Sequence, residues 1–303
     1  METRVLPFTD EAIDEAARLI LGGSPVAVPT ETVYGLAADA TNAEAVARIY
    51  EAKGRPSFNP LIVHVPDLET AERIGEFPPQ AHSLADEHWP GPLTLVVPLR
   101  ETAGIASIVT AGLPTVGIRV PAHPAMQALL RSVRRPLAAP SANASGSISP
   151  TRAEHVLRSL SGRIPLVIDA GPTERGLEST IVGVAAGQLR VLRPGPIAIE
   201  AELSEDETIQ APGQLASHYA PSKPLRLNAY EASPDEYLIG FGSVAGTCSL
   251  SGAGDLVQAA ARLFDLLHQA DASDKARIAV APIPAEGLGA AINDRLQRAA
   301  HPR

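Results

Sequence analysis

Strand-like and helix-like stretches alternate irregularly along this chain, and this irregularity limits the folds that it can form. Short apolar, β-rich runs lie at 25–28, 61–65, 94–97 and 116–120. Apolar residues at helical spacing separate some of these runs but not all of them. Strands that adjoin without an intervening helix favour antiparallel pairing, whereas helical crossovers permit parallel pairing. We therefore expect an α/β fold with a twisted sheet of mixed parallel and antiparallel strands.

The polar stretch after the first of these runs is a candidate ligand site. The apolar residues 25–28 lead into Thr30, Glu31 and Thr32, which place two hydroxyls beside one carboxylate. In open α/β sheets, ligands bind at the carboxyl ends of strands, where such loops emerge. An ordinary turn at the end of a strand also uses threonine, so this stretch alone does not separate the two interpretations.

Cations flank the end of the next predicted helix, over 43–53. Its N-terminus has the capping-box spacing from Thr41 to Glu44, and Lys53 and Arg55 lie at its C-terminus. Cations at a helix C-terminus are common and mildly stabilising. The same pair can instead clamp a triphosphate. The chain contains no glycine-rich loop of the Walker type, so such a clamp would be of another kind.

Two further charged or titratable residues lie inside apolar runs. Arg119 lies in the run 116–120, where a charge is costly unless it is paired. It can hold a ligand carboxylate with its planar fork, make a buried ion pair, or lie at an exposed edge. His64, in the run 61–65, is more typical of a core histidine than of a catalyst. No second histidine at ligand spacing supports a metal site, and we expect none.

Serines gather before another predicted helix, over 151–160. Ser149-Pro150 is expected to cap this helix, with the proline at its first position. Hydroxyls and backbone N–H groups beside a helix N-terminus suit phosphate binding, and the loop from Ser141 supplies both. Such residues also form ordinary loops.

The chain divides into three predicted parts. Residues 1–203 contain the mixed strand and helix patterns of the first domain. Residues 204–235 are polar, weakly periodic and rich in Glu, Ser and Pro, which is typical of a linker. Residues 236–303 read as strand, helix, strand and helix, so we expect a small α/β domain there.

Composition narrows the class of protein. The formal net charge of -9 argues against a protein that mainly coats nucleic acid, which needs clustered Lys and Arg. The single Cys248 excludes an intramolecular disulfide framework and is compatible with a reducing cytoplasm. No apolar run reaches transmembrane length, and the N-terminus lacks a signal-peptide pattern. We expect a soluble cytoplasmic protein without membrane contact.

Seven strings are specific enough to indicate a family. They occur in order over roughly residues 10–200: PTETVYGL, KGRPSFNPLIVHV, WPGPLTLVV, VGIRVP, PSANASG, ESTIV and LRPG. Together they resemble the YrdC-like family of threonylcarbamoyl-AMP synthases. The later strings SHYAP and GLGAAINDRL resemble the longer, two-domain branch of that family, whose second domain is small, α/β and Rossmann-like.

The resemblance implies a nucleotidyltransferase. Such an enzyme makes L-threonylcarbamoyl-AMP from L-threonine, bicarbonate or CO2, and ATP, and it releases pyrophosphate. Mg²⁺ accompanies the ATP phosphates and is not held in a protein cage. A partner transferase complex then moves the threonylcarbamoyl group to the adenosine beside the anticodon of certain tRNAs, with at most weak tRNA contact by the synthase. The implied fold is a twisted mixed sheet with a concave, electropositive cleft.

The resemblance also implies roles for individual residues. Arg119 would take the threonine carboxylate, Ala139 would act through its backbone, and Tyr219 would close over the nucleotide from the linker. The threonine pocket would comprise Thr32, His64, Arg119, Ala139 and Ser179. The ATP site would comprise Lys53, Arg55, Asn59, Thr115, Ser141, Ser149, Arg193 and Tyr219. Gln214 departs from the family pattern, because a more apolar residue is expected at that place in the linker.

Two alternatives remain from the sequence. A concave sheet bearing Lys53, Arg55, Arg119 and Arg193 could instead be an RNA-binding module of the same fold, without adenylate synthesis. The acidic net charge weighs against that alternative. The second alternative is a related carbamoyl-adenylate activity that uses an acceptor other than threonine.

Overall fold

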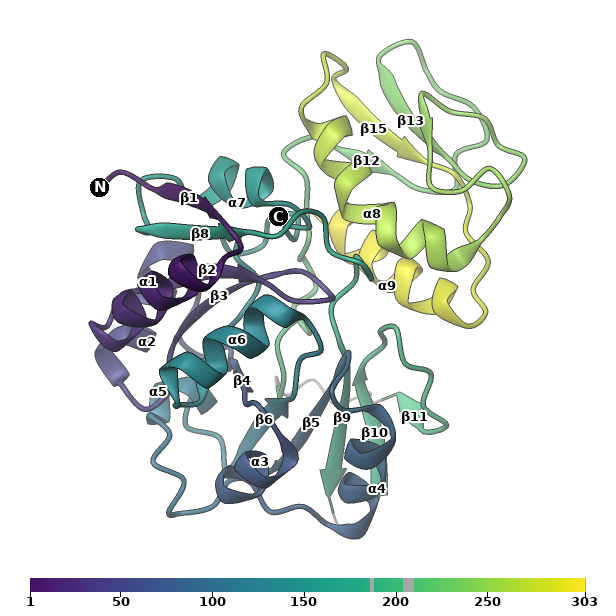
Figure 1. The fold of residues 1–303 in the computed structure, drawn as a ribbon. Helices are drawn as coiled ribbons and strands as arrows, with labels where there is room; N and C mark the ends of the chain where they lie inside the picture. Colours follow the sequence, from purple (N-terminus) through teal and green to yellow (C-terminus); the bar gives the residue numbers. More distant parts are fainter. Residues whose placement is uncertain (186–187, 204–209, 303) are drawn as a thin grey trace.

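The computed structural model describes residues 1–185, 188–203 and 210–302. Among these residues, the strands form one large sheet and one small sheet, which lie side by side with two helices between them (Figure 1). The strands of the large sheet are β1 (Arg4–Pro7), β2 (Val26–Pro29), β3 (Tyr34–Asp39), β4 (Ile62–His64), β5 (Leu93–Pro98), β6 (Thr115–Arg119), β7 (Leu137–Ala138), β8 (Leu166–Asp169), β9 (Thr180–Ala185), β10 (Gln188–Arg193) and β11 (Glu202–Leu203).

The large sheet is mixed, which confirms the expected fold class. Its order is β1-β8-β2-β3-β7-β4-β6-β5-β9-β10-β11. The pairs β2–β3, β3–β7, β4–β7, β5–β6 and β9–β10 are antiparallel, and β4–β6 and β5–β9 are parallel. β3 was missed by the sequence patterns, because its residues follow β2 after only a short polar turn and read as part of a loop.

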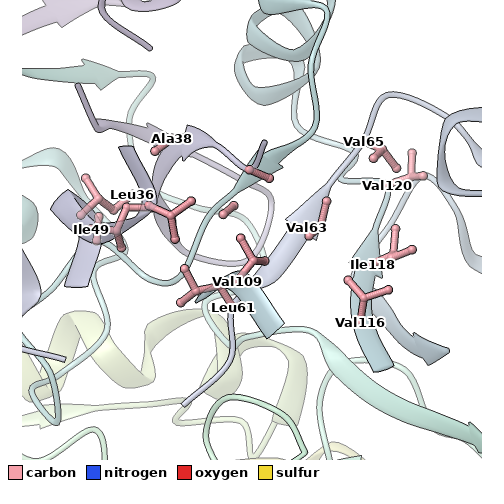
Figure 2. Packing of buried hydrophobic residues seen from close by; sticks show 14 of the residues in the cluster. Leu36, Ala38, Ile49, Leu61, Val63, Val65, Val109, Val116, Ile118 and Val120 are labelled. Atoms are coloured by element: carbon pink, nitrogen blue, oxygen red, sulfur yellow. The ribbon is translucent and has the colours of Figure 1, made fainter. Parts of the chain in front are cut away.

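Helices cover both faces of this sheet. They are α1 (Asp10–Leu21), α2 (Ala43–Lys53), α3 (Leu68–Ile74), α4 (Pro79–His88), α5 (Ser107–Thr110), α6 (Pro124–Val133) and α7 (Ala153–Leu160). α1 and α6 pack together against one face, at the β2 and β8 side. α2 and α5 pack on the other face over a core that includes Val63, Leu95 and Ile118 (Figure 2). Alternate residues of β4 and β6 therefore face away from that core.

Two predicted helix starts are wrong in detail. Asn42, and not Thr41, caps α2 by accepting from the N–H groups of Glu44 and Ala45, while the Thr41 hydroxyl donates to Asp39. α7 begins at Ala153 and not directly after Pro150, so Ser149 does not lie at its N-terminus. By contrast, the expected boundaries of α2, 43–53, agree with the structure.

The small domain is a parallel sheet with two helices. Its strands are β12 (Leu225–Arg226), β13 (Glu236–Gly240), β14 (Cys248–Ser249) and β15 (Arg277–Val280), in the order β12-β15-β13-β14. α8 (Leu256–Asp271) and α9 (Leu288–Ala300) lie on the side that faces the large domain (Figure 1). β12 pairs with β15, so this sheet begins inside the range 204–235 that was expected to be only a linker. Part of that range, 204–209, lies outside the described residues.

The two domains share a continuous buried core. Val33, Ile148 and Leu177 of the first domain pack in one cluster with Leu263 of α8 and Ile292 of α9. An Arg152–Asp265 ion pair of 2.8 Å crosses the same boundary. Of the helices in the described part of the chain, none is long and apolar enough to cross a membrane.

Candidate active site

A cavity of about 50 Å³ lies on the side of the large sheet that carries Ile62 and His64. Its floor comes from β4 and β6, its walls come from the ends of neighbouring strands, and linker residues 212–213 and 218–219 cover it. Every residue expected in the threonine pocket lines this cavity: Thr32, His64, Arg119, Ala139 and Ser179. Four of those expected at ATP also line it: Arg55, Ser141, Arg193 and Tyr219.

Strand register brings His64 and Arg119 together. β4 and β6 run parallel, with Ile62 opposite Gly117 and His64 opposite Arg119. Residues two apart on a strand share a face, so Ile62, His64 and Arg119 all point away from the helix-covered core. Both polar side chains are almost fully buried, at 3% and 4% exposure. A single-residue slip of this register would turn one of them into the core.

Arg119 both makes an ion pair and faces the cavity. Its Nη2 donates to the Glu31 carboxylate at 2.5 Å, its Nη1 to the Thr32 hydroxyl at 3.0 Å, and its Nε to the Gly91 carbonyl at 3.1 Å. Burial would raise the pKa of Glu31, but the Arg119 charge and hydrogen bonds outweigh it and lower that pKa. These contacts fix the plane of the guanidinium. The ion-pair interpretation is thus correct, and it does not exclude a ligand at the same group.

His64 is a neutral imidazole in the wall beside this guanidinium. Burial and the Arg119 charge lower its pKa to about 3. Its Nδ1 has no hydrogen-bond partner among the described residues. A buried nitrogen without a partner is unfavourable in the free protein, and a polar group of a ligand would satisfy it.

Lys53, expected to assist at the ATP phosphates, does not line the cavity. Its ammonium donates to the carbonyls of Ser141 at 2.6 Å and Asn143 at 2.5 Å. Burial, together with the nearby Arg55 charge, lowers the pKa of Lys53 well below its usual value. Lys53 therefore holds the 141–143 loop in place from behind, and only Ser141 of that loop reaches the cavity.

Arg55 reaches the cavity while fixing its own loop. Its guanidinium donates to the carbonyls of Asn59 at 3.2 Å and Pro60 at 2.9 Å, which folds residues 55–60 into a closed turn. Asn59 is buried behind this turn and does not line the cavity, and its side-chain oxygen has no partner among the described residues. Burial lowers the pKa of Arg55 to about 10, so it stays charged at neutral pH.

Ser179 is held in the opposite wall by Arg193. The Arg193 guanidinium donates to the Ser179 carbonyl at 2.9 Å and to its hydroxyl oxygen at 3.1 Å. It also donates to the Pro212 carbonyl of the linker at 3.2 Å. Ala139, expected to act through its backbone, uses its N–H on the Ile62 carbonyl at 3.0 Å.

Two more expected ATP residues lie beside the cavity. Thr115 lines a smaller neighbouring cavity of about 10 Å³, which shares Ile62 and Pro212 with the larger one. Ser149 is fully buried, and its hydroxyl donates to the Glu178 carboxylate at 2.5 Å. Ser149 was expected to offer a hydroxyl to phosphate from a helix N-terminus; in this arrangement it instead fixes a carboxylate that lines the cavity.

The linker fills much of the space over the site. Tyr219 is 1% exposed, adopts a φ of 62°, and its hydroxyl has no partner among the described residues. Gly213, at a φ of 89°, passes so close that a Cβ there would come within 2.6 Å of that hydroxyl. A cavity of 50 Å³ holds no more than a few water molecules, so a ligand of the size of ATP would fit there only if the linker moved.

Gln214 has a local explanation. Its side-chain oxygen accepts from the N–H groups of Gln210 at 2.8 Å and Ala211 at 2.9 Å, which closes a turn in the linker. An apolar residue could not make these bonds, so the polar residue at this place stabilises the turn that carries Pro212 and Gly213 over the cavity.

Glu178 is a cavity-lining residue that the sequence analysis did not single out. Only the hydroxyls of the string Glu178-Ser179-Thr180 were considered, yet the carboxylate lines the cavity and pairs with Arg295 at 2.9 Å. The sequence shows a carboxylate next to two hydroxyls, but it does not show that this carboxylate is buried or that its partner lies 117 residues away. His218 also lines the cavity and was not singled out. Among the described residues, no group of three metal-ligating side chains comes together.

Comparison with known proteins agrees with this geometry. The family model described as Telomere recombination, which groups Sua5, YciO and YrdC, matches residues 18–195. The model of the Threonylcarbamoyl-AMP synthase C-terminal domain matches residues 177–301. The Bacillus subtilis threonylcarbamoyl-AMP synthase is 41% identical and aligns over 98% of this chain and 95% of its own length. The Pyrococcus abyssi enzyme of the same name is 38% identical over 94% of this chain and 92% of its own length.

Solved structures show the same relationship. The crystal structure of P. abyssi Sua5 complexed with L-threonine has a TM-score of 0.90 at 35% identity, covering 99% of this chain and 98% of that one. The Escherichia coli YciO structure, at a TM-score of 0.59 and 20% identity over 66% of this chain, shares the fold of the large domain. Full-length relatives that are synthases favour the enzyme over the RNA-binding alternative. This chain belongs to the two-domain, Sua5-type threonylcarbamoyl-AMP synthases.

Proposed function

We propose that the cavity between β4, β6 and the linker is where this enzyme forms L-threonylcarbamoyl-AMP from L-threonine, bicarbonate-derived CO2 and ATP. One observation carries the proposal: Arg119, Arg55 and Ser141, which are far apart in the sequence, line a single cavity. A carboxylate-binding fork and a cation for a triphosphate are the two features that these substrates require.

In this proposal, threonine binds at the floor. Its carboxylate meets the guanidinium of Arg119, which Glu31 and Gly91 hold in a fixed plane. His64 is uncharged at neutral pH, so it can form a hydrogen bond with threonine without competing with Arg119 for the threonine carboxylate. Thr32 and Ser179 supply hydroxyls on either side. Fixed donors of this kind orient a substrate without reorganising during the reaction.

The chemistry then has two steps. The nitrogen of the uncharged threonine amine forms a C–N bond to CO2 as one C=O π bond opens onto oxygen, and a proton passes from that nitrogen to water, which gives a carbamate. A carbamate oxygen attacks the α-phosphorus of ATP, and the bond to pyrophosphate breaks. Arg55 and Arg193 are placed to neutralise phosphate charge. Glu178, which lines the cavity, and Glu31, which pairs with the cavity-lining Arg119, are both engaged by arginines, so Mg²⁺ would arrive on the ATP phosphates and neutralise them.

The linker would act as a lid in this scheme. Tyr219 and Pro212 must leave the space that they cover before ATP enters, and their return would exclude water from a mixed anhydride that hydrolyses readily. We also infer a cytoplasmic location, with which the free Cys248 is compatible. We infer delivery of the product to a tRNA threonylcarbamoyl transferase complex, because a mixed anhydride left in water hydrolyses.

The test is product formation. With ATP, threonine and bicarbonate, mass spectrometry should detect threonylcarbamoyl-AMP, and pyrophosphate release should require all three. Arg55→Gln should lose most of the activity, whereas Arg73→Gln, whose side chain is 71% exposed on α3, should keep it. Pyrophosphate release that does not depend on threonine would contradict the proposal. An adenylate formed from ATP and carbamoyl phosphate, in place of threonine and bicarbonate, would favour the carbamoyl-adenylate activity with a different acceptor.

A further inference from the structure

Arg295 is a buried cation whose partners lie on both sides of the domain boundary. It belongs to the string GLGAAINDRL on α9, to which the reaction assigns no role. Its side chain is completely buried, although it does not line the cavity. Its Nη1 donates to Asp294 at 2.6 Å within α9, and its Nε donates to Glu178 of the first domain at 2.9 Å.

Through Glu178, Arg295 is connected to the cavity wall. One oxygen of that carboxylate accepts from Arg295, and the other accepts from the Ser149 hydroxyl at 2.5 Å. A carboxylate that is 6% exposed needs such hydrogen-bonding partners to offset the cost of its burial. The second domain therefore supplies the group that balances a charge in the wall of the first.

The same guanidinium lies against the lid. Its Cζ is 5.2 Å from the centre of the Tyr219 ring, within the range of a cation–π contact. Phe264 of α8 approaches that ring at 5.6 Å between centres. The Tyr219 backbone is in the left-handed region, which a tyrosine rarely adopts without support from its surroundings. Arg295 and Phe264, both from the second domain, provide that support.

We propose that Arg295 is the positioning residue through which the second domain places the lid, holding the Tyr219 ring over the cavity while it fixes Glu178 and Ser149 below. It touches neither substrate directly and acts through these three side chains. A lysine cannot replace it, because a point charge on a flexible chain cannot contact Glu178, Asp294 and an aromatic face at once. Only the kinetic part of this inference rests on the proposed function.

Hydrogen–deuterium exchange of the ligand-free full chain tests the positioning itself. In Arg295→Lys, the amides of residues 211–222 should exchange about tenfold faster, since loss of a desolvated cation–π contact corresponds to about one decade in the opening equilibrium. One of these amides is that of Ala220, which donates to the Gly146 carbonyl at 2.8 Å in the wild-type chain. Amides of α8 should stay protected. Arg277→Lys, at an exposed ion pair of the same domain, is the control and should change neither segment.

A double variant, Glu178→Gln with Arg295→Gln, covers the case in which an unpaired Glu178 unfolds the single variant. It removes both charges and should also loosen residues 211–222 while α8 stays protected. Unchanged linker exchange in both variants would overturn the inference. So would equal loss of protection in α8, because Arg295 would then be only a structural ion pair.

Steady-state kinetics give the second readout. Arg295→Lys should lower kcat about tenfold, in line with the expected loosening of the lid. It should leave the threonine KM within about twofold of the wild-type value, because Arg295 contacts none of Thr32, His64 and Arg119. A threonine KM that rises in parallel with the fall in kcat would contradict the inference. If the wild-type chain made no threonylcarbamoyl-AMP, the proposed function would fail, but the exchange result would still decide the role of Arg295 at the lid.

Discussion

Replacing Arg119 by lysine separates charge from shape at the floor of the cavity. The guanidinium now makes three contacts in three directions, to Glu31, Thr32 and Gly91. An ammonium can keep the ion pair with Glu31, but it cannot reach the other two from the same position. Arg119→Lys therefore keeps the charge in the site and removes the plane that a carboxylate would meet.

The expected magnitudes follow from the bonds that are lost. A hydrogen bond to a charged group contributes about 1.5–3 kcal/mol, so losing one of two bonds to the threonine carboxylate should raise the threonine KM about 10- to 100-fold. Losing the contacts to Gly91 and Thr32 should lower the free energy of unfolding by about 2–4 kcal/mol. The ATP KM should change little, because the proposed function assigns Arg119 to threonine and Arg55 and Arg193 to the phosphates.

The assay is pyrophosphate release at varied threonine and saturating ATP, with calorimetry of threonine binding as a second measure. Arg55→Lys is the matched control, since it also keeps a cation in the same cavity but should raise the ATP KM and spare the threonine KM. A threonine KM unchanged in Arg119→Lys, or raised equally in both variants, would refute the assignment of the carboxylate to Arg119.

Three other perturbations give distinct results. Lys53→Met should lower the free energy of unfolding by about 2–4 kcal/mol, because two buried carbonyls lose their donor. It should leave the threonine KM unchanged. A raised ATP KM with unchanged urea unfolding would show that Lys53 contacts phosphate. Gly213→Ala should cost about 1–2 kcal/mol from its positive φ and speed proteolysis of the linker, since its Cβ meets Tyr219; unchanged proteolysis would contradict this packing. Burial lowers the pKa of His268 to about 4, so the unfolded state binds more protons and stability is lost as pH falls from about 6.5 toward 4. Between pH 7 and pH 5, the free energy of unfolding of His268→Phe, measured in urea, should therefore fall by about 2 kcal/mol less than that of the wild type. An equal fall in both proteins would assign the acid sensitivity to another group.

Local features of the fold could be predicted from the sequence because they depend on residues close together in the chain. The helix over 43–53 begins and ends where its spacing indicates, and the glycine after Lys53 ends α2 in the left-handed conformation. The mixed sheet followed from strands that adjoin without a crossover. The error at Thr41 arose because Asp39 accepts the threonine hydroxyl, which leaves the neighbouring Asn42 to cap the helix.

Long-range features could not be predicted in the same way. His64 lies beside Arg119 because two strands pair in one register out of several that their lengths permit. Lys53 was placed at the phosphates because a cation near a predicted site suggests a ligand, yet its ammonium bonds backbone carbonyls 88 and 90 residues away. The resemblance to a family gave nine residues that line the cavity together with Lys53, Asn59, Thr115 and Ser149, which do not, and it could not show which of these support others from behind.

The arrangement of the cations explains how an acidic chain keeps such a site folded without substrates. Arg55, Arg119 and Arg193 each donate to backbone carbonyls of their own walls, so burial leaves few of their N–H groups without acceptors. Their orientation is therefore set before a substrate arrives, which is the condition for electrostatic stabilisation of a transition state. Tyr219 occupies the space that remains, and its hydroxyl has no partner among the described residues. Because that hydroxyl makes no hydrogen bond within the described part of the chain, moving the ring costs its packing and its contact with Arg295 but breaks no bond at its tip, and we infer a lid that yields to ATP and not a permanently closed core.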